Sequence, residues 1–267
     1  MRDRFGDADG ALRFGWRPLF AVLTLAILIA TAYYFARGYS ADAGISALSD
    51  FVLYREAAWR WLTDGSFYLA RQLDSPYTVT IGDVLYPPPF LVLLVPIALL
   101  PLPLAALTWW GIPAAIIAVC LVRLRPAPWS WPLLALTLWW PSTLDRIAAG
   151  NPLIWLTAIL YLTALVPGPS ALILLKPTLA PFAFFRANNR QWGIVAGTLL
   201  LISLFFVPLW FDYARVLANA RSFAGLGYSL EEFPALAGAL VAFAARGRPD
   251  PAAAIETEEE STGVDTE

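Results

Sequence analysis

Long apolar runs, broken by prolines and isolated charges, constrain this chain more than any other feature. The run from Pro18 to Ala36 is close to the ~20 residues that a helix needs to cross a bilayer, and a second run covers 104–122. Hydrophobic residues make up 59% of the 267 residues and charged residues 14%, whereas soluble domains have about 45–50% and about 25%. The sequence therefore predicts an all-α integral membrane protein.

Arginines indicate how the chain is oriented. The first 17 residues form a basic leader with four arginines, Arg2, Arg4, Arg13 and Arg17, which places the N-terminus in the cytoplasm. A cleaved signal peptide is the alternative for the run after it, but apolar segments continue along the chain and favour an uncleaved anchor. We therefore expect a multi-pass protein of the cell membrane. Its domains are a cytoplasmic leader (1–17), a membrane domain (18–245) and an acidic disordered tail (246–267).

Proline and polar breaks divide the membrane domain into segments of unequal length. A first extracytoplasmic loop is expected at 37–86, followed by a short segment at 87–100 and a span at 104–122. Another short segment at 129–141 and a polar break at 142–151 lead to a span at 152–166. Two half-length pieces at 170–175 and 178–185, a long span at 193–211, a polar loop at 212–232 and a last segment at 234–245 complete the domain. With the first run, this makes roughly seven to nine membrane segments, some of them short or re-entrant.

The first loop contains an acidic residue next to apolar sequence. Ser49 to Leu62 predicts an amphipathic helix in which Phe51, Ala58 and Leu62 can face the membrane, while Asp50, Tyr54 and Arg60 mark a wetter side. Either Ser49 or Asp50 could cap this helix. A charge at the rim of a lipid-embedded bundle is costly, so Asp50 is a candidate functional residue.

Composition excludes several kinds of chemistry. The chain has no histidine, which rules out histidine general bases, Ser-His-Asp triads and histidine metal ligands. Its one cysteine, Cys120, lies in an apolar run, as expected for a small core residue. We find no glycine-rich phosphate loop and no paired-carboxylate metal signature, so we expect no required metal or cofactor. The net charge of −2 indicates no nucleic-acid partner.

Lys176 lies where two apolar pieces meet, directly before Pro177. Proline breaks the helix there, and the freed backbone groups are tolerated in lipid only if protein or a water-filled cavity satisfies them. Lys176 could therefore bind a phosphate as a point charge, although a lysine that snorkels to the interface is the alternative. Arg146 and Arg55 are further phosphate candidates. An interfacial anchor is the alternative for Arg146.

Several short motifs resemble, in order, those of family 87 glycosyltransferases. They are Asp50, Tyr54, Ala57-Ala58, Gly65 and Tyr68 in the first loop, Tyr86-Pro87-Pro88 at the return to the membrane, Gly150-Asn151 before an apolar helix, and Leu175-Lys176-Pro177. The resemblance covers about residues 15–210, and the chain would be a short form without the usual Gln beside Gly150. It implies a GT-C-like bundle and a polyprenyl-phosphate sugar, such as a mannosyl donor, as substrate.

The resemblance and the residues together predict one activity. We expect transfer of a mannose-like hexose from a polyprenyl-phosphate donor to a lipid or glycan acceptor on the extracytoplasmic face, with membrane lipids as further partners. Asp50 would be the general base, and one carboxylate without a second nucleophile predicts inversion. The substrate-binding candidates are Tyr54, Tyr86, Arg146, Asn151 and Lys176. The tyrosines could instead belong to an interfacial belt, and Asn151 could simply cap the next helix. A transporter or lipid flippase and a non-catalytic membrane scaffold are the alternative functions.

Overall fold

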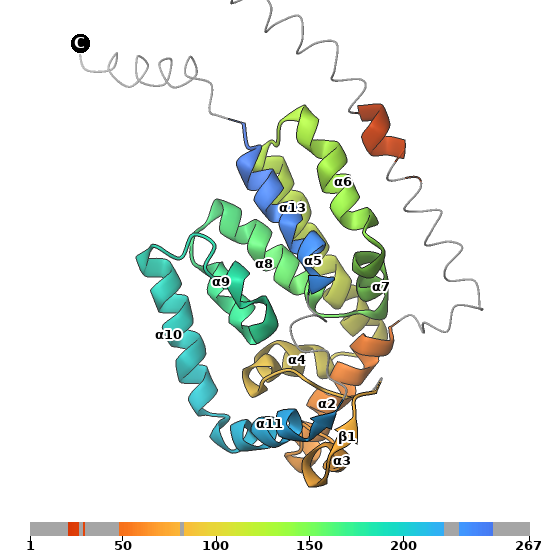
Figure 1. The fold of residues 1–267 in the computed structure, drawn as a ribbon, viewed down its shortest axis with the longest axis vertical. Helices are drawn as coiled ribbons and strands as arrows, with labels where there is room; N and C mark the ends of the chain where they lie inside the picture. Colours follow the sequence, from red (N-terminus) through yellow and green to blue (C-terminus); the bar gives the residue numbers. More distant parts are fainter. Residues whose placement is uncertain (1–20, 27–28, 30–47, 81–82, 222–229, 248–267) are drawn as a thin grey trace, which may run out of the picture.

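Helices dominate the described part of the chain (Figure 1). The computed structural model describes residues 21–26, 29, 48–80, 83–221 and 230–247. The α-helices are α2 (Ser49–Asp64), α3 (Ala70–Asp74), α4 (Leu91–Ala98), α5 (Leu102–Leu124), α6 (Trp131–Trp139), α7 (Pro141–Ala149), α8 (Leu153–Leu165), α9 (Ala180–Ala183), α10 (Arg190–Leu204), α11 (Val207–Asn219) and α13 (Phe233–Ala244). Short 3-10 helices are η1 (Pro88–Phe90), η2 (Pro128–Ser130), η3 (Pro169–Leu175) and η4 (Pro177–Leu179).

One short β pair departs from the predicted all-α class. The strands β1 (Tyr77–Thr78) and β2 (Ala220–Arg221) pair in parallel, with Tyr77 opposite Ala220. Tyr77 also donates a hydrogen bond from its hydroxyl to the carbonyl of Val216 (3.3 Å). These contacts join the first loop to the end of α11, 139 residues further along the chain.

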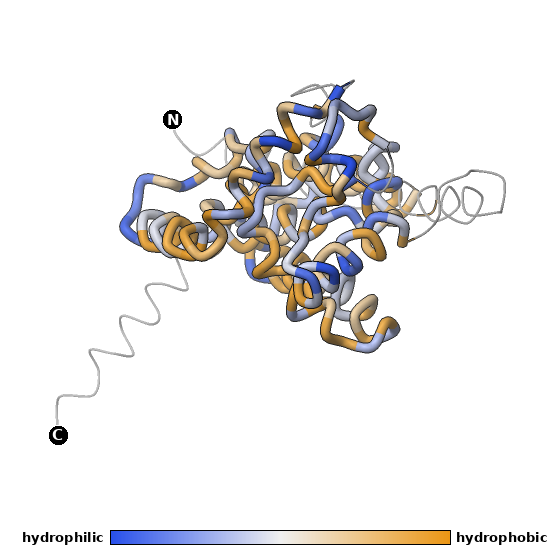
Figure 2. Tube along the Cα trace, turned by 90° about the horizontal axis from the view of Figure 1, so that it is seen from below, coloured by the Kyte–Doolittle hydropathy of each residue, from blue (hydrophilic) through white to orange (hydrophobic). Residues whose placement is uncertain are grey.

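By length and composition, α5 is the one helix in the described residues that could cross a membrane by itself. Two bent pairs would raise the number to three if each pair makes one span: α7 with α8 (110°) and α10 with α11 (90°). Two shorter apolar helices cover Pro88–Ala98 and Phe233–Ala244. Figure 2 shows that hydrophobic residues recur along much of the described chain. The count of seven to nine segments and the GT-C-like arrangement stay predictions.

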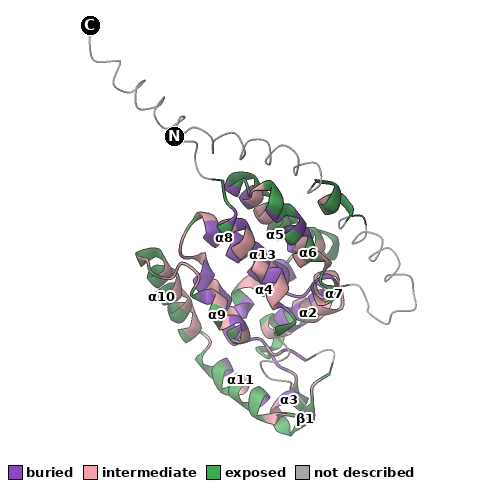
Figure 3. Ribbon diagram, turned by 45° about the horizontal axis from the view of Figure 1, so that its top comes forward, coloured by how far each residue is buried: buried purple, intermediate pink, exposed green. Residues whose placement is uncertain are grey.

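The long span predicted at 193–211 is not one continuous helix, because the chain bends by 90° within it. α10 ends at Leu204 and α11 begins at Val207. Pro208 lies in the first turn of α11, and since proline has no backbone N–H it cannot continue the hydrogen-bond ladder of α10. α10 has no buried residue (Figure 3), and Phe205 beyond it is 86% exposed. An apolar surface of this kind is typical of contact with lipid or another protein.

The polar break predicted at 142–151 contains a helix, after which the chain bends by 110° into α8. Most of it forms the helix α7, which ends at Gly150 in the left-handed conformation (φ 80°). The polar loop predicted at 212–232 is also partly helical, since α11 continues to Asn219. Polar side chains mark these segments in the sequence, but they do not prevent a helix that keeps its apolar residues on one face.

The predicted amphipathic helix is present as α2, but its faces differ from the prediction. Phe51 and Ala58 do not form an outer face, since both are buried in the protein. Tyr54, expected on the wetter side, is buried with them. No side chain caps the helix, because Leu48 occupies the N-cap position. The buried residues recur at spacings of three and four, as the helical period requires when one face packs on α4.

Two hydrophobic clusters form the core. We call the first the aromatic cluster; it includes Phe51, Tyr54, Phe67, Tyr68, Tyr86, Phe90 and Trp109. The second, the aliphatic cluster, is built where α5, α8, η3 and α13 pack together and includes Leu153, Leu156, Leu160, Ile173, Leu236, Ala239 and Ala242. The predicted leader, most of the first span and nearly all of the acidic tail lie outside the described residues.

Candidate functional site

Asp50 and Asn151 form the first part of a polar cluster. Asp50 lies in the first turn of α2 and is half-buried. Its Oδ2 accepts a hydrogen bond from the side-chain amide of Asn151 (2.9 Å), a residue 101 positions away. Asn151 is 1% exposed, and its Oδ1 accepts the backbone N–H of Leu153 (3.1 Å). Asn151 thus both holds the beginning of α8 and fixes the Asp50 carboxylate.

Gly150 sets the position of Asn151. A left-handed φ of 80° is readily adopted only by glycine. A Cβ at this position would also lie 2.5 Å from Cβ of Phe51 and 3.0 Å from the ring of Trp110. The backbone carbonyl of Gly150 accepts a hydrogen bond from the indole of Trp109 (2.9 Å). The chain therefore turns from α7 into α8 against the face of α2 that carries Asp50.

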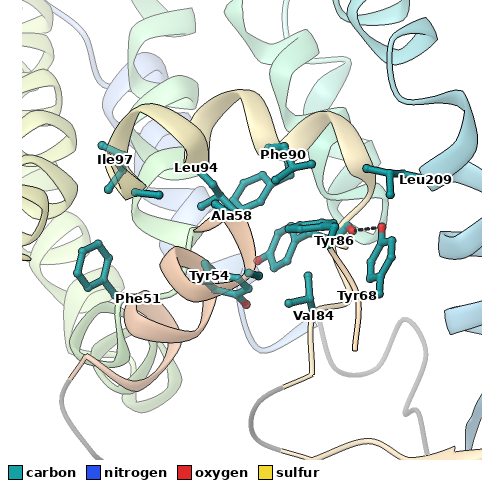
Figure 4. Packing of buried hydrophobic residues seen from close by; sticks show 14 of the residues in the cluster. Phe51, Tyr54, Ala58, Tyr68, Val84, Tyr86, Phe90, Leu94, Ile97 and Leu209 are labelled. Carbon is teal, nitrogen blue, oxygen red and sulfur yellow. Dashed lines mark hydrogen bonds between the residues drawn. The ribbon is translucent and has the colours of Figure 1, made fainter. Parts of the chain in front are cut away.

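Tyr86 lies beside this carboxylate–amide pair. Its hydroxyl donates to Oδ1 of Asn151 at 3.5 Å, and its ring meets that of Tyr54 edge-on at 5.3 Å (Figure 4). The hydroxyl of Tyr68 donates to the backbone carbonyl of Tyr86 (2.9 Å). Burial raises the pKa of the Tyr68 phenol, with smaller contributions from Tyr213 and Asp212. Tyr68 therefore stays protonated and keeps its role as a donor.

A buried ion-paired group forms the second part of the cluster. Nζ of Lys176 lies 2.6 Å from Oε1 of Glu232, and the guanidinium of Arg146 lies 3.4 Å from the same oxygen. Glu232 is fully buried and Lys176 is 7% exposed. Arg146 also approaches Glu231, whose side chain is 65% exposed, at 3.6 Å. Nζ of Lys176 lies 5.3 Å from the centre of the Tyr86 ring, a cation–π distance that joins the two parts of the cluster.

The structure thus gathers all six predicted site residues into one connected group: Asp50, Tyr54, Tyr86, Arg146, Asn151 and Lys176. Arg55 lies outside it and donates to the carbonyl of Leu100 (3.0 Å). Glu232 is a member that the sequence did not reveal. A buried lysine needs a charged partner, but nothing in the pattern distinguishes Glu232 from Glu231, its exposed neighbour.

An apolar cavity of about 420 Å³ is lined in part by Leu175, the sequence neighbour of Lys176. It is lined from α4, α5, α8, η3 and α10, and its lining includes Val92, Ile116, Trp155, Leu175 and Ile202. Leu175 directly precedes Lys176, so one short segment contributes to both the cavity and the ion-paired group. The indole N–H of Trp155 is buried without a hydrogen-bond partner among the described residues.

No metal site is evident in the part of the chain that the structure describes, where no three acidic or cysteine side chains are grouped closely enough to hold an ion. Cys120 is buried and has a free thiol. The expectation that the protein requires no metal or cofactor stays a prediction.

The fold and cluster define a mostly helical protein with at least one helix able to cross a membrane. A comparison of the chain with family models, with curated proteins and with solved structures finds no match. The assignment of a function therefore depends on the chemistry of the cluster.

Proposed function

We propose that the protein is an integral-membrane glycosyltransferase. It moves a mannose-like hexose from a polyprenyl-phosphate donor to a lipid or glycan acceptor on the extracytoplasmic face. One observation carries this proposal: a half-buried carboxylate, Asp50, and a buried cation, Lys176, belong to one cluster, linked through Asn151 and Tyr86. Transfer from a sugar phosphate requires both a base for the acceptor and positive charge for the leaving group.

Each group then has a defined task. Asp50 takes the proton of the acceptor hydroxyl as its oxygen bonds to the anomeric carbon. The bond from that carbon to the phosphate oxygen breaks, and the electron pair leaves with the phosphate. Lys176 and Arg146 stabilise the charge that develops on this phosphate. Attack from the side opposite the leaving group inverts the anomeric carbon, since the buried carboxylate of the cluster, Glu232, is paired with Lys176 and Arg146 and does not serve as a nucleophile.

Asn151 and the tyrosines position these groups. The amide of Asn151 donates to Oδ2 of Asp50 and leaves Oδ1 available for the acceptor. The rings of Tyr54 and Tyr86 are buried and pack on each other, so their part is to hold the Tyr86 hydroxyl against Asn151 and thereby the Asp50 carboxylate. The apolar cavity supports a donor with a hydrocarbon chain, because it is lined by Leu175, the residue directly before Lys176, and could take an apolar chain whose phosphate binds Lys176.

A lipid transporter or flippase is the second candidate. The two sharply bent helix pairs favour it, since broken helices commonly line substrate pathways. Product analysis separates the two functions, because a flippase moves its lipid across proteoliposomes without forming a glycosidic bond. A non-catalytic scaffold would give neither flux nor product.

The direct test is incubation of the purified protein with radiolabelled polyprenyl-phosphate sugars and native membrane lipids. The proposal expects a new labelled glycolipid or glycan whose anomeric configuration is opposite to that of the donor. Retention of configuration would contradict the single-carboxylate mechanism. No product with any donor, together with measurable flux of the intact donor, would favour the transporter.

A further inference from the structure

Glu232 offsets part of the positive charge of the two cations in the cluster, Lys176 and Arg146. Its Oε1 contacts both Lys176 and Arg146, and its side chain is fully shielded from solvent. Oε2 is also buried, and it has no hydrogen-bond partner in the described part of the chain. Oε1 accepts a hydrogen bond from Nζ of Lys176 (2.6 Å), so the negative charge of this carboxylate is held directly against the two cations. Because solvent does not screen it, this charge acts strongly on any anion that approaches the same cations.

The segment around Glu232 is fixed in place. The hydroxyl of Ser142 donates to the backbone carbonyl of Glu231 (2.5 Å), which ties the beginning of α13 to α7. α13 then packs closely on α8 and α6, where a Cβ on Gly238 would lie 2.8 Å from the Tyr161 hydroxyl. The carboxylate therefore remains near the cations when a ligand binds.

The three side chains of this group, Lys176, Arg146 and Glu232, carry two positive charges and one negative charge. Glu231, exposed and 3.6 Å from Arg146, and Asp50, linked to Lys176 through Asn151 and Tyr86, add further negative charge around it. A phosphodiester has one negative charge, as each phosphate of a nucleic-acid backbone does. A phosphate monoester has about −1.5 to −2 at pH 7. The negative charge of Glu232 therefore opposes the binding of a monoester more strongly than that of a diester.

We propose that Glu232 is a specificity-determining residue that makes the cation pair prefer a phosphodiester to a phosphate monoester. This inference rests on the proposed function, in which the donor is a polyprenyl phosphodiester of a sugar and the spent carrier is a monoester. Glu232 then permits donor binding and weakens the hold on the spent carrier. Product release follows from a fixed charge and requires no movement of the chain.

The test measures binding, so it requires no turnover. Farnesyl phosphate and its methyl diester, which have the same hydrocarbon chain, are titrated calorimetrically into the full-length protein in detergent. The wild type binds the diester at least as tightly as the monoester. Glu232→Gln binds the monoester about tenfold more tightly and changes the diester affinity less than about threefold. Glu231→Gln is the matched control and leaves both affinities near the wild-type values, since its exposed charge is screened.

Two results would overturn the inference. One is a wild-type preference for the monoester, which can be measured even if Glu232→Gln does not fold. The other is an equal change in both affinities in Glu232→Gln, with the melting temperature confirming that this variant is folded. Neither result bears on turnover, so sugar transfer that depends on Asp50 would stand. Absence of binding by both ligands would instead contradict the proposed donor itself.

Discussion

The two halves of the polar cluster are held by different means. Asp50 is half-buried and has a neutral partner, the amide of Asn151, whereas Lys176 is buried and has a charged partner, Glu232. The two halves meet at Tyr86 of the aromatic cluster, whose hydroxyl donates to Asn151 and whose ring lies 5.3 Å from Nζ of Lys176. A carboxylate with a neutral partner keeps its charge available for a proton. A buried carboxylate partner holds the cation in place and offsets part of its positive charge.

This difference predicts that the second half contributes to stability as well as to phosphate binding, whereas Asp50 contributes to activity with little effect on stability. Removing one member of a buried ion pair weakens the compensation of the other member, which is costly. Replacing a half-buried carboxylate with an isosteric amide keeps its shape, and the amide oxygen can still accept the hydrogen bond from Asn151. Substitution of Asp50 should therefore change the chemistry alone, and substitution of Lys176 should change both chemistry and folding.

The largest expected effect on stability is that of Lys176→Met. It leaves the buried Glu232 with Arg146 as its nearest cation, at 3.4 Å. We expect a loss of about 3–5 kcal/mol in the free energy of unfolding, measured by denaturant unfolding in detergent. The double variant Lys176→Met/Glu232→Leu should recover at least half of this loss, because an apolar pair needs no charge compensation. Equal instability of the single and double variants would show that the ion pair is not the cause.

Gly150→Ala should have the next largest effect. The substitution forces alanine into a left-handed conformation and places its Cβ 2.5 Å from Cβ of Phe51. We expect a loss of about 2 kcal/mol or more, together with weaker sugar transfer as Asn151 moves from Asp50. Gly193→Ala in α10 is the control, since nothing lies within 4 Å of a Cβ there. If both alanine variants melt at the wild-type temperature, the close packing of α2 on this turn is not needed.

Tyr68→Phe should have a smaller effect at neutral pH. It removes the 2.9 Å hydrogen bond to the buried carbonyl of Tyr86, a loss of about 1 kcal/mol. The raised pKa of Tyr68 also predicts a dependence on pH. Above pH ~10 the phenol ionises in the unfolded chain but not in the folded protein, so stability falls as pH rises.

This dependence is measured as the free energy of unfolding at alkaline pH. Ionisation of a single tyrosine lowers the free energy of unfolding by up to about 1.4 kcal/mol per pH unit. Tyr68→Phe should remove that part of the dependence of this free energy on pH. A slope that is unchanged in the variant would mean that other groups, such as Tyr213, account for the alkaline loss.

The sequence predicted the components of the site better than the path of the chain. Asp50 and Lys176 stood out because charges beside apolar runs are costly, and Asn151 because it belongs to a motif that resembles a family element; the structure gives each of the three a hydrogen-bond partner. Glu232 was missed because the pairing of residues 56 positions apart leaves no local pattern. The bend after Leu204 was missed because apolar residues continue through it, although Pro208 was a signal.

The face of α2 was also predicted wrongly, for a physical reason. Tyr54 has a hydroxyl, which suggested a wetter side, but its ring packs against Tyr86 and Phe90 in the aromatic cluster. A tyrosine can bury its ring wherever the packing accommodates it, so residue polarity alone does not determine which side of such a helix faces the core.

The most direct test of the account is the rate of sugar transfer from a radiolabelled polyprenyl-phosphate hexose by wild type, Asp50→Asn and Asp64→Asn in detergent. The account predicts that Asp50→Asn lowers the rate at least ~100-fold, as expected for loss of a general base, with little change in melting temperature. Asp64→Asn, at the exposed end of the same helix, should retain the wild-type rate. Transfer by Asp50→Asn at the wild-type rate would contradict the central claim that this carboxylate is the base.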